Sequence, residues 1–281
     1  MKLFNKTSSD SPRAEMSFAD HIDELRKHLF RSAIAVVIGA VFIGVNNKFI
    51  TQKILMGPTH KDFLTYKLLC SIGQRLGKGS QLCMQEITVK LQSNTVAGEF
   101  GVFMNIILIG GFIVAFPYVF YQFWKFIKPA LTTKELKNTT GVIFWVSVLF
   151  FLGTAFGYFV IAPYTINFFA NFTLDDNIEN KWTIMSYFNT IVPLILGAGL
   201  SFQLPLVMYF LAKINVVNAA LLRKGRRYAV LGIVIVASII TPPDMLSTII
   251  VSIPIYILYE ISILLAAKVD KSRKQVEEEW S

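Results

Sequence analysis

A charged stretch stands directly before the first apolar segment of this chain and contains the residue types that bind a cation. It reads His21-Ile-Asp-Glu-Leu-Arg-Lys-His-Leu29. Carboxylates such as that of Glu24 form charge-assisted hydrogen bonds with cationic donors. About five more apolar segments follow, several of them joined by short basic loops. This pattern indicates a membrane protein that receives something cationic at one face.

The sequence contains no pattern typical of an intramembrane enzyme. All three histidines, His21, His28 and His60, lie outside the expected membrane core. Neither H-E-x-x-H nor G-x-S-x-G occurs, so the signatures of zinc peptidases and serine hydrolases are missing. We therefore expect no catalytic residues, no metal site and no cofactor.

The two cysteines lie in the same long loop, and three states are open to them. Cys70 and Cys83 both fall between residues 47 and 98. In an oxidising compartment they can pair and close a loop of about a dozen residues. Two free thiols are the alternative, and metal binding is disfavoured because only His60 is nearby. A disulfide is the state we favour.

Composition and hydropathy predict the elements that position these residues. The chain has 281 residues, of which 54% are hydrophobic and 16% charged. Apolar runs of about 18–25 residues can cross a hydrocarbon core of about 30 Å as helices. Such runs occur at about 29–46, 101–123, 140–162, 189–212, 228–242 and 248–267. We therefore predict an all-α integral membrane protein, with one six-helix domain at 16–268.

The chain outside this domain is short and polar. Residues 1–15 are expected to form a disordered tail, and residues 269–281 a second tail. No short apolar signal-peptide region precedes the first run. In the long loop 47–98, the alternation at 84–92 suggests a strand.

Basic residues are distributed unevenly over the expected loops and predict the orientation. Of the 27 Lys and Arg residues, 19 lie on the face that carries both termini, and 7 of the other 8 lie in loop 47–98. Long loops cross membranes with little regard for charge, so the basic residues of loop 47–98 carry little weight. The face with the other basic loops is expected to be cytoplasmic, and both termini lie on it. The scatter of the basic residues over short loops argues against nucleic-acid binding.

The stretch before the first run is expected to form an amphipathic helix. Ser17 can cap it, and its apolar residues recur at helical spacing from Phe18 to Leu29. We expect this helix to lie along the cytoplasmic interface and then turn into the first span. The fifth span is short, because Thr241-Pro-Pro-Asp244 ends it after about 21 Å.

Two polar residues fall within the apolar spans. Gln203 either holds helices together through its amide or belongs to a polar patch that contacts a partner helix. A carboxylate at depth is costly, so Glu260 is expected to be protonated, paired or near the interface.

Five segments, in order, resemble the TatC family, the multispan core of twin-arginine protein translocases. The first is the opening stretch at 21–29. The others are Phe116-Pro-Tyr-Val-Phe-Tyr-Gln-Phe-Trp-Lys-Phe-Ile-Lys-Pro-Ala-Leu131 with Glu135, Phe151-Leu-Gly-Thr-Ala-Phe-Gly-Tyr-Phe-Val-Ile-Ala-Pro163, Ser201-Phe-Gln-Leu-Pro205, and Thr241-Pro-Pro-Asp244 with Ile253-Pro-Ile-Tyr-Ile-Leu-Tyr-Glu260.

The resemblance implies a concave, glove-like arrangement of six helices with both termini cytoplasmic. It also implies a bacterial inner-membrane receptor for the paired-arginine signal peptides of folded cargo. Such a receptor assembles with single-span TatA- and TatB-type subunits, forms oligomers with itself within lipid, and exports cargo with the proton-motive force. A secondary transporter or channel for a small solute is the alternative that intramembrane polar residues and broken helices also suggest.

The resemblance assigns roles to individual residues. Glu24 and Glu135 match the acids that face the two signal-peptide arginines, whose guanidinium forks suit carboxylates better than lysine does. Arg26, Phe126 and Pro129 match positions that shape the same surface.

Each acid also has a simpler interpretation. Glu24 can be a solvated helix acid, and Glu135 can close a capping box that begins at Thr132.

Partner contacts are expected along spans four to six, around Gln203 and at the polar positions Glu260 and Asp244. The sequence departs from the family pattern at Gln203, where the family often has Glu. A glutamine carries no ionisable proton. A mechanism that needs one at this position is therefore in doubt for this chain.

Overall fold

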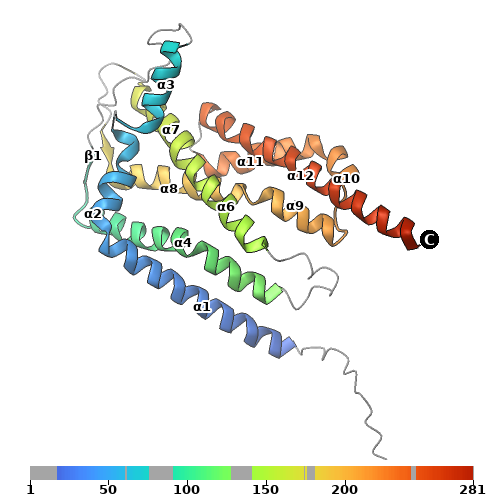
Figure 1. The fold of residues 1–281 in the computed structure, drawn as a ribbon. Coiled ribbons are helices and arrows are strands. Elements are labelled where there is room, and N and C mark those ends of the chain that lie inside the picture. Colours follow the sequence, from blue (N-terminus) through green and yellow to red (C-terminus); the bar gives the residue numbers. More distant parts are fainter. Residues whose placement is uncertain are drawn as a thin grey trace, which may run out of the picture.

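The computed structural model describes residues 18–60, 62–75, 91–127, 141–173, 175, 181–241 and 245–280. These residues are almost wholly helical (Figure 1). The elements are α1 (Phe18–Val45), α2 (Asn47–Phe49), η1 (Ile50–Leu55), η2 (Gly57–Thr59), α3 (Leu64–Arg75), β1 (Leu91–Gln92), α4 (Gly98–Ile127), α6 (Val142–Phe156), η5 (Gly157–Ile161), α7 (Ala162–Asn171), β2 (Trp182–Thr183), α8 (Ile184–Ser201), α9 (Leu204–Lys213), α10 (Ala219–Lys224), α11 (Arg226–Ile240) and α12 (Met245–Trp280).

Five helical segments are long and apolar enough to cross a membrane. They are Ile22–Val45, Gly98–Ile127, Val142–Asn171, Ile184–Lys213 and Ser247–Arg273. Each of the six expected runs overlaps one of the observed helices. The fifth run corresponds to α11, which has 15 residues and is therefore only about 22 Å long.

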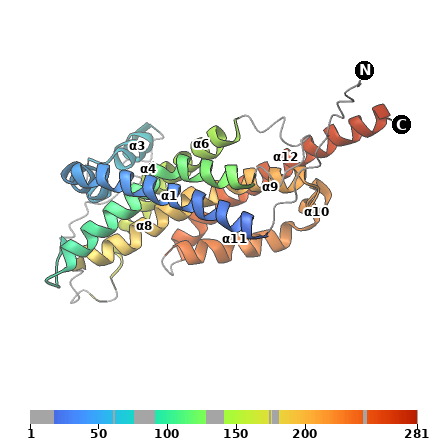
Figure 2. The same cartoon turned by 90° about the horizontal axis from the view of Figure 1, so that it is seen from below.

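The long helices lie side by side, and α1 and α4 run antiparallel (Figures 1 and 2). The first residues of α1, the last residues of α4 and the last residues of α9 and α12 point toward the same end of the bundle, which we call the terminal face. Helix α3 and the start of α8 lie at the opposite end, which we call the loop face. Strands β1 and β2 pair in parallel at the loop face, in a sheet of two residues per strand.

Helix α1 differs from its expected form. It is one continuous helix of 28 residues and does not turn after an interfacial segment. No proline occurs in α1, and its first glycine is Gly39. The backbone hydrogen bonds of the helix therefore continue without interruption past Leu29, where the charged stretch ends. The charged stretch and the apolar run consequently share one helix axis.

Helices α1 and α4 approach backbone to backbone at two small residues. A Cβ atom on Gly111 would lie 2.5 Å from the backbone nitrogen of Ala40, and one on Gly39 would lie 2.6 Å from the Gly111 carbonyl oxygen. Small residues allow this close approach between membrane helices, where packing replaces the hydrophobic effect. This contact fixes the position of α1 on the bundle.

An aromatic cluster joins α4, α6 and α9 near the terminal face. The ring of Phe150 is fully buried and stacks on Phe116 with 3.5 Å between centroids. Trp124 in turn contacts Phe210 of α9, with 4.7 Å between centroids. The cluster therefore ties three helices together by ring contacts alone.

Three tyrosine hydroxyls donate to backbone carbonyls at the start of the first long loop, two of them from the bundle and one, Tyr66, from α3 within the loop. Tyr158 donates to the Ile54 carbonyl at 2.8 Å, Tyr187 to Leu55 at 2.6 Å and Tyr66 to Pro58 at 2.7 Å. These carbonyls lie where η1 and η2 end and helical partners are missing. Burial raises the pKa of the Tyr66 hydroxyl above its ordinary value.

Replacing Tyr187 with phenylalanine is expected to destabilise the protein by about 1–3 kcal/mol, because the buried Leu55 carbonyl loses its donor. Thermal unfolding of the purified protein in detergent measures this change. Tyr164→Phe is the matched control, since Tyr164 is partly exposed and its hydroxyl makes no hydrogen bond to the described residues. Equal melting temperatures for the two variants would contradict the assigned role of Tyr187.

The last helix extends beyond the apolar run and contacts the loop between α9 and α11. Residues 269–280, expected as part of a tail, continue α12. Asp270 accepts a hydrogen bond from the backbone N–H of Ala219 at 2.8 Å, and Arg273 donates to the Ala212 carbonyl at 2.8 Å. Arg273 also donates to the side chain of Asn215, whose backbone has a φ of 63°. These contacts satisfy the start of α10 and the end of α9.

Candidate functional site

The candidate site at the terminal face is formed by the first turns of α1 and the last turns of α4. Along the charged stretch, Glu24 and His28 are half-buried while Asp23, Arg26 and Lys27 are exposed. Glu24 and His28 are four residues apart, so they lie on the same side of α1.

Contacts of His28 show that this side of α1 faces α4. Its Nδ1 lies 2.7 Å from Oε1 of Gln122, and its ring meets that of Phe126 edge to face with 6.5 Å between centroids. Gln122 is 2% exposed, so the hydrogen bond satisfies a polar side chain within the helix contact. Glu24 lies one turn beyond His28, toward the terminal face.

The Glu24 carboxylate has no hydrogen bond or ion pair with any described residue. None of the described residues therefore competes with a cationic ligand for this carboxylate. Phe126, which contacts His28, brings an aromatic ring to this side of α1. A half-buried carboxylate one helical turn from the ring contact of His28 with Phe126 is suited to an arginine side chain, which can pair with a carboxylate and stack on a ring.

Arg26 lies elsewhere on α1. Two residues correspond to about 200° around a helix, so Arg26 does not share the side that carries Glu24. Its guanidinium lies 5.7 Å from the ring centre of Phe30. Both residues line a shallow depression with Asp23, Lys27 and Arg31. The expectation that Arg26 shapes the surface around Glu24 remains a prediction.

The structure places Gln203 at the break between α8 and α9, in the turn before Pro205. Its Nε2 donates to the Val146 carbonyl of α6 at 3.2 Å, which joins two helices as the first interpretation expected. Its Oε1 is buried and has no hydrogen-bond partner in the part of the chain that the structure describes. The amide therefore holds α6 and keeps one acceptor open, so a contact with a partner helix stays a prediction.

Glu260 is paired. It accepts from Arg226 at 2.8 Å and from the hydroxyl of Tyr256 at 3.1 Å. The side chain of Arg226 is 48% exposed and that of Glu260 is 33% exposed. Of the three states expected for Glu260, the structure shows the pair.

Four residues of the predicted sites, Pro129, Glu135, Asp244 and Cys83, lie outside the described residues. Cys70 is disulfide-bonded, while its pairing with Cys83 stays a prediction. Among the described residues, no group of three or more His, Cys, Asp or Glu is arranged to hold a metal ion.

Comparison with known proteins decides the family. The sequence model of the Sec-independent protein translocase protein TatC matches residues 20–254. The chain belongs to the TatC family. One relative is the Sec-independent protein translocase protein TatC of Blattabacterium sp. subsp. Periplaneta americana. The two sequences are 40% identical over 92% of this chain and 98% of the relative. With TatCy of Bacillus subtilis it shares 32% identity over 90% of this chain and 89% of the relative.

The fold agrees with the TatC family. A crystal structure of the twin-arginine translocase receptor TatC in DDM aligns with a TM-score of 0.70 and 28% identity, covering 88% of this chain and 99% of that one. The chain is thus a multi-pass membrane protein of a translocase family, and it is a component of the Sec-independent translocase. These findings support the translocase interpretation and not the small-solute transporter.

Sequence reasoning missed the contact that orients the TatC-type site. Gln122 stands within an apolar run, and His28 closes the charged stretch, so each was visible as a polar residue at a helix position. Their pairing depends on the antiparallel register of α1 and α4, and periodicity alone does not define that register.

Proposed function

We propose that this chain is the receptor subunit of a twin-arginine translocase and binds the paired arginines of signal peptides at the terminal face. It is a protein-binding subunit and not an enzyme. The observation that carries the proposal is the half-buried carboxylate of Glu24, which has no partner among the described residues and lies beside the contact of His28 with α4. Glu135 is proposed as the second acid.

The surroundings of Glu24 favour arginine over lysine. A guanidinium offers two parallel N–H groups to both carboxylate oxygens, and its plane stacks on a ring such as that of Phe126. An ammonium group has neither feature. We therefore infer that the site discriminates between Arg-Arg and Lys-Lys peptides through pairing geometry, since the charge of the two peptides is the same.

The membrane arrangement follows from the basic residues. We propose that the chain resides in a bacterial inner membrane with both termini in the cytoplasm, where the terminal face meets newly made cargo. The 19 Lys and Arg residues on this side support that orientation. The chain would assemble with single-span TatA- and TatB-type subunits and with further copies of itself, and export would use the proton-motive force.

Replacing Glu24 with glutamine is expected to reduce binding of an Arg-Arg signal peptide about tenfold, because one charge-assisted pair is lost. Photo-crosslinking of the peptide in native membranes, titrated over peptide concentration, measures the change. The same substitution should have little effect on a Lys-Lys peptide, because the unchanged protein already binds that peptide weakly. Glu135→Gln tests the second acid in the same assay.

Glu99→Gln is the matched control. Glu99 is an exposed acid in the first turn of α4, at the other end of the same helix. Crosslinking that is equal for Glu24→Gln, Glu99→Gln and the unchanged protein would reduce Glu24 to a solvated helix acid. Equal crosslinking of the Arg-Arg and Lys-Lys peptides to the unchanged protein would overturn the receptor function.

A further inference from the structure

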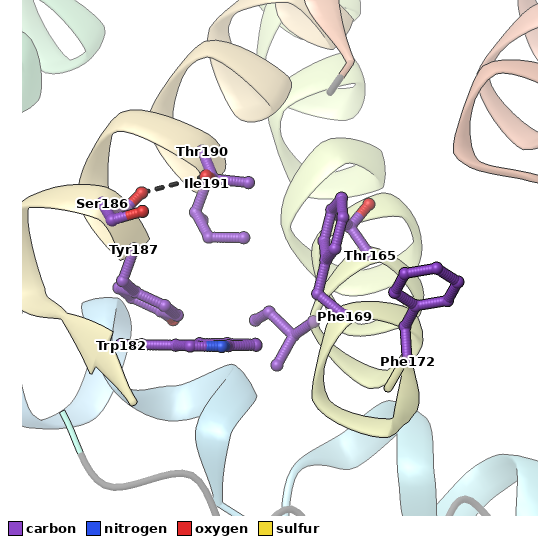
Figure 3. Close-up of a pocket in the computed structure, with 9 residues that line it drawn as sticks. Thr165, Phe169, Phe172, Trp182, Ser186, Tyr187, Thr190 and Ile191 are labelled. Atoms are coloured by element: carbon purple, nitrogen blue, oxygen red, sulfur yellow. Dashed lines mark hydrogen bonds between the residues drawn. The ribbon is translucent and has the colours of Figure 1, made fainter. Parts of the chain in front are cut away.

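A cavity at the loop face contains polar groups that no described residue satisfies. It has a volume of about 280 Å³ and lies between α7 and α8 (Figure 3). Figure 3 shows Phe169 on α7 across from Tyr187 and Ile191 on α8, with Phe172 just after the end of α7 and the indole plane of Trp182 below Tyr187. The lining is mainly aromatic and aliphatic.

Most hydroxyl groups of this cavity already have partners. Thr165 pairs with the Ser247 hydroxyl at 3.2 Å, Tyr187 donates to Leu55 and Thr190 donates to the Ser186 carbonyl at 2.9 Å.

Two groups of the cavity lack a partner among the described residues, namely the indole N–H of Trp182 and the hydroxyl of Ser186. Both can donate a hydrogen bond, so the cavity offers donors next to an apolar surface.

The position of the cavity indicates what fills it. It lies where the membrane segment Val142–Asn171 ends and the segment Ile184–Lys213 begins. The ends of such segments lie at the membrane interface, where tryptophan and tyrosine concentrate. A phospholipid presents ester and phosphate oxygens, which only accept hydrogen bonds, directly above its acyl chains at this depth.

We propose that this cavity binds one membrane phospholipid. Oxygens of its glycerol and phosphate region accept hydrogen bonds from Trp182 and from the exposed Ser186, and the upper part of an acyl chain lies against Phe169 and Ile191. The lipid thereby fills the gap between α7 and α8. This inference concerns the loop face and is independent of the signal-peptide site.

Native mass spectrometry of the purified full chain, titrated with palmitoyl-oleoyl phosphatidylethanolamine, tests the proposal. We expect one saturable lipid per chain. Combining Trp182→Phe with Ser186→Ala removes both donors, keeps the apolar lining and should weaken this binding about tenfold. Thr190→Phe fills the cavity and should abolish it.

Ser238→Phe is the matched control for the filled cavity. Ser238 lies on α11, is exposed and donates to the carbonyl four residues earlier, as Thr190 does. Thermal unfolding identifies any variant that is misfolded. Lipid binding that is equal in all variants would overturn the proposal.

A crosslinker placed at Phe169 provides a second test in native membranes. A benzoylphenylalanine at this position should yield a phospholipid adduct. An adduct with a polypeptide in its place would assign the cavity to a protein partner and overturn the lipid.

Discussion

Replacing Gly111 with valine is expected to destabilise the protein by about 3 kcal/mol, near the upper end of overpacking effects. The atoms in the way belong to the backbone of α1, at Ala40 and Val36. No rotamer change can make room, so α1 must move away from α4. Because His28 and Gln122 meet across the same helix pair, the displacement should also weaken signal-peptide binding. Thermal unfolding in detergent should show a fall of about 5–10 °C.

Gly232→Val separates overpacking from the general effect of valine in a membrane helix. Gly232 lies within α11, is exposed, and a Cβ atom there would meet nothing within 4 Å. This variant should melt close to the unchanged protein. If both glycine variants melted alike, the close approach of α1 and α4 would not be a determinant of stability.

Replacing Phe150 with alanine is the second change with a large expected effect, about 3–5 kcal/mol. Its ring is fully buried between helices and stacks on Phe116. In a membrane such a contact contributes through packing, because lipid tails solvate an exposed ring as well as the protein does. The cavity left by alanine would remove contacts to α4 and leave the aromatic cluster loose.

Phe144→Ala tests that argument on the same helix. Phe144 is 63% exposed, so lipid can replace its contacts and the expected loss of stability is small. Cell-membrane levels and melting temperatures of the two variants should differ clearly. Similar losses for both would show that ring removal acts through lipid contact and not through the helix interface.

The length of the apolar runs predicted the membrane helices well, because each long helix must present enough apolar surface to lipid over its length. Proline was a weaker guide. The helix breaks just before Pro205, yet Pro117 and Pro254 lie inside continuous helices. Neighbouring helices can satisfy the groups that proline frees, and a single sequence does not show which neighbours do so.

The candidate site was predictable in part. The family pattern singled out Glu24, and helical spacing placed it on the side of α1 that carries His28. The same spacing places Arg26 on another side of α1, although the resemblance assigned it to the surface around Glu24. The sequence did not show that Arg26 contacts Phe30. Nor could it show that Tyr158 and Tyr187 bind the first loop, since their partners Ile54 and Leu55 are 104 and 132 positions away. Long-range pairs of this kind depend on how helices pack.

The contacts that Asp270 and Arg273 of α12 make with the chain between α9 and α10 have a consequence for biogenesis. The ribosome makes residues 212–219 well before Asp270 and Arg273, which are 51 and 61 positions away from their backbone partners. Until the last helix has been synthesised and inserted, the end of α9 and the start of α10 therefore lack these contacts. We therefore expect a chain that stops before residue 270 to lack the contacts that hold this loop, and to be cleaved there by membrane proteases more readily than the full chain.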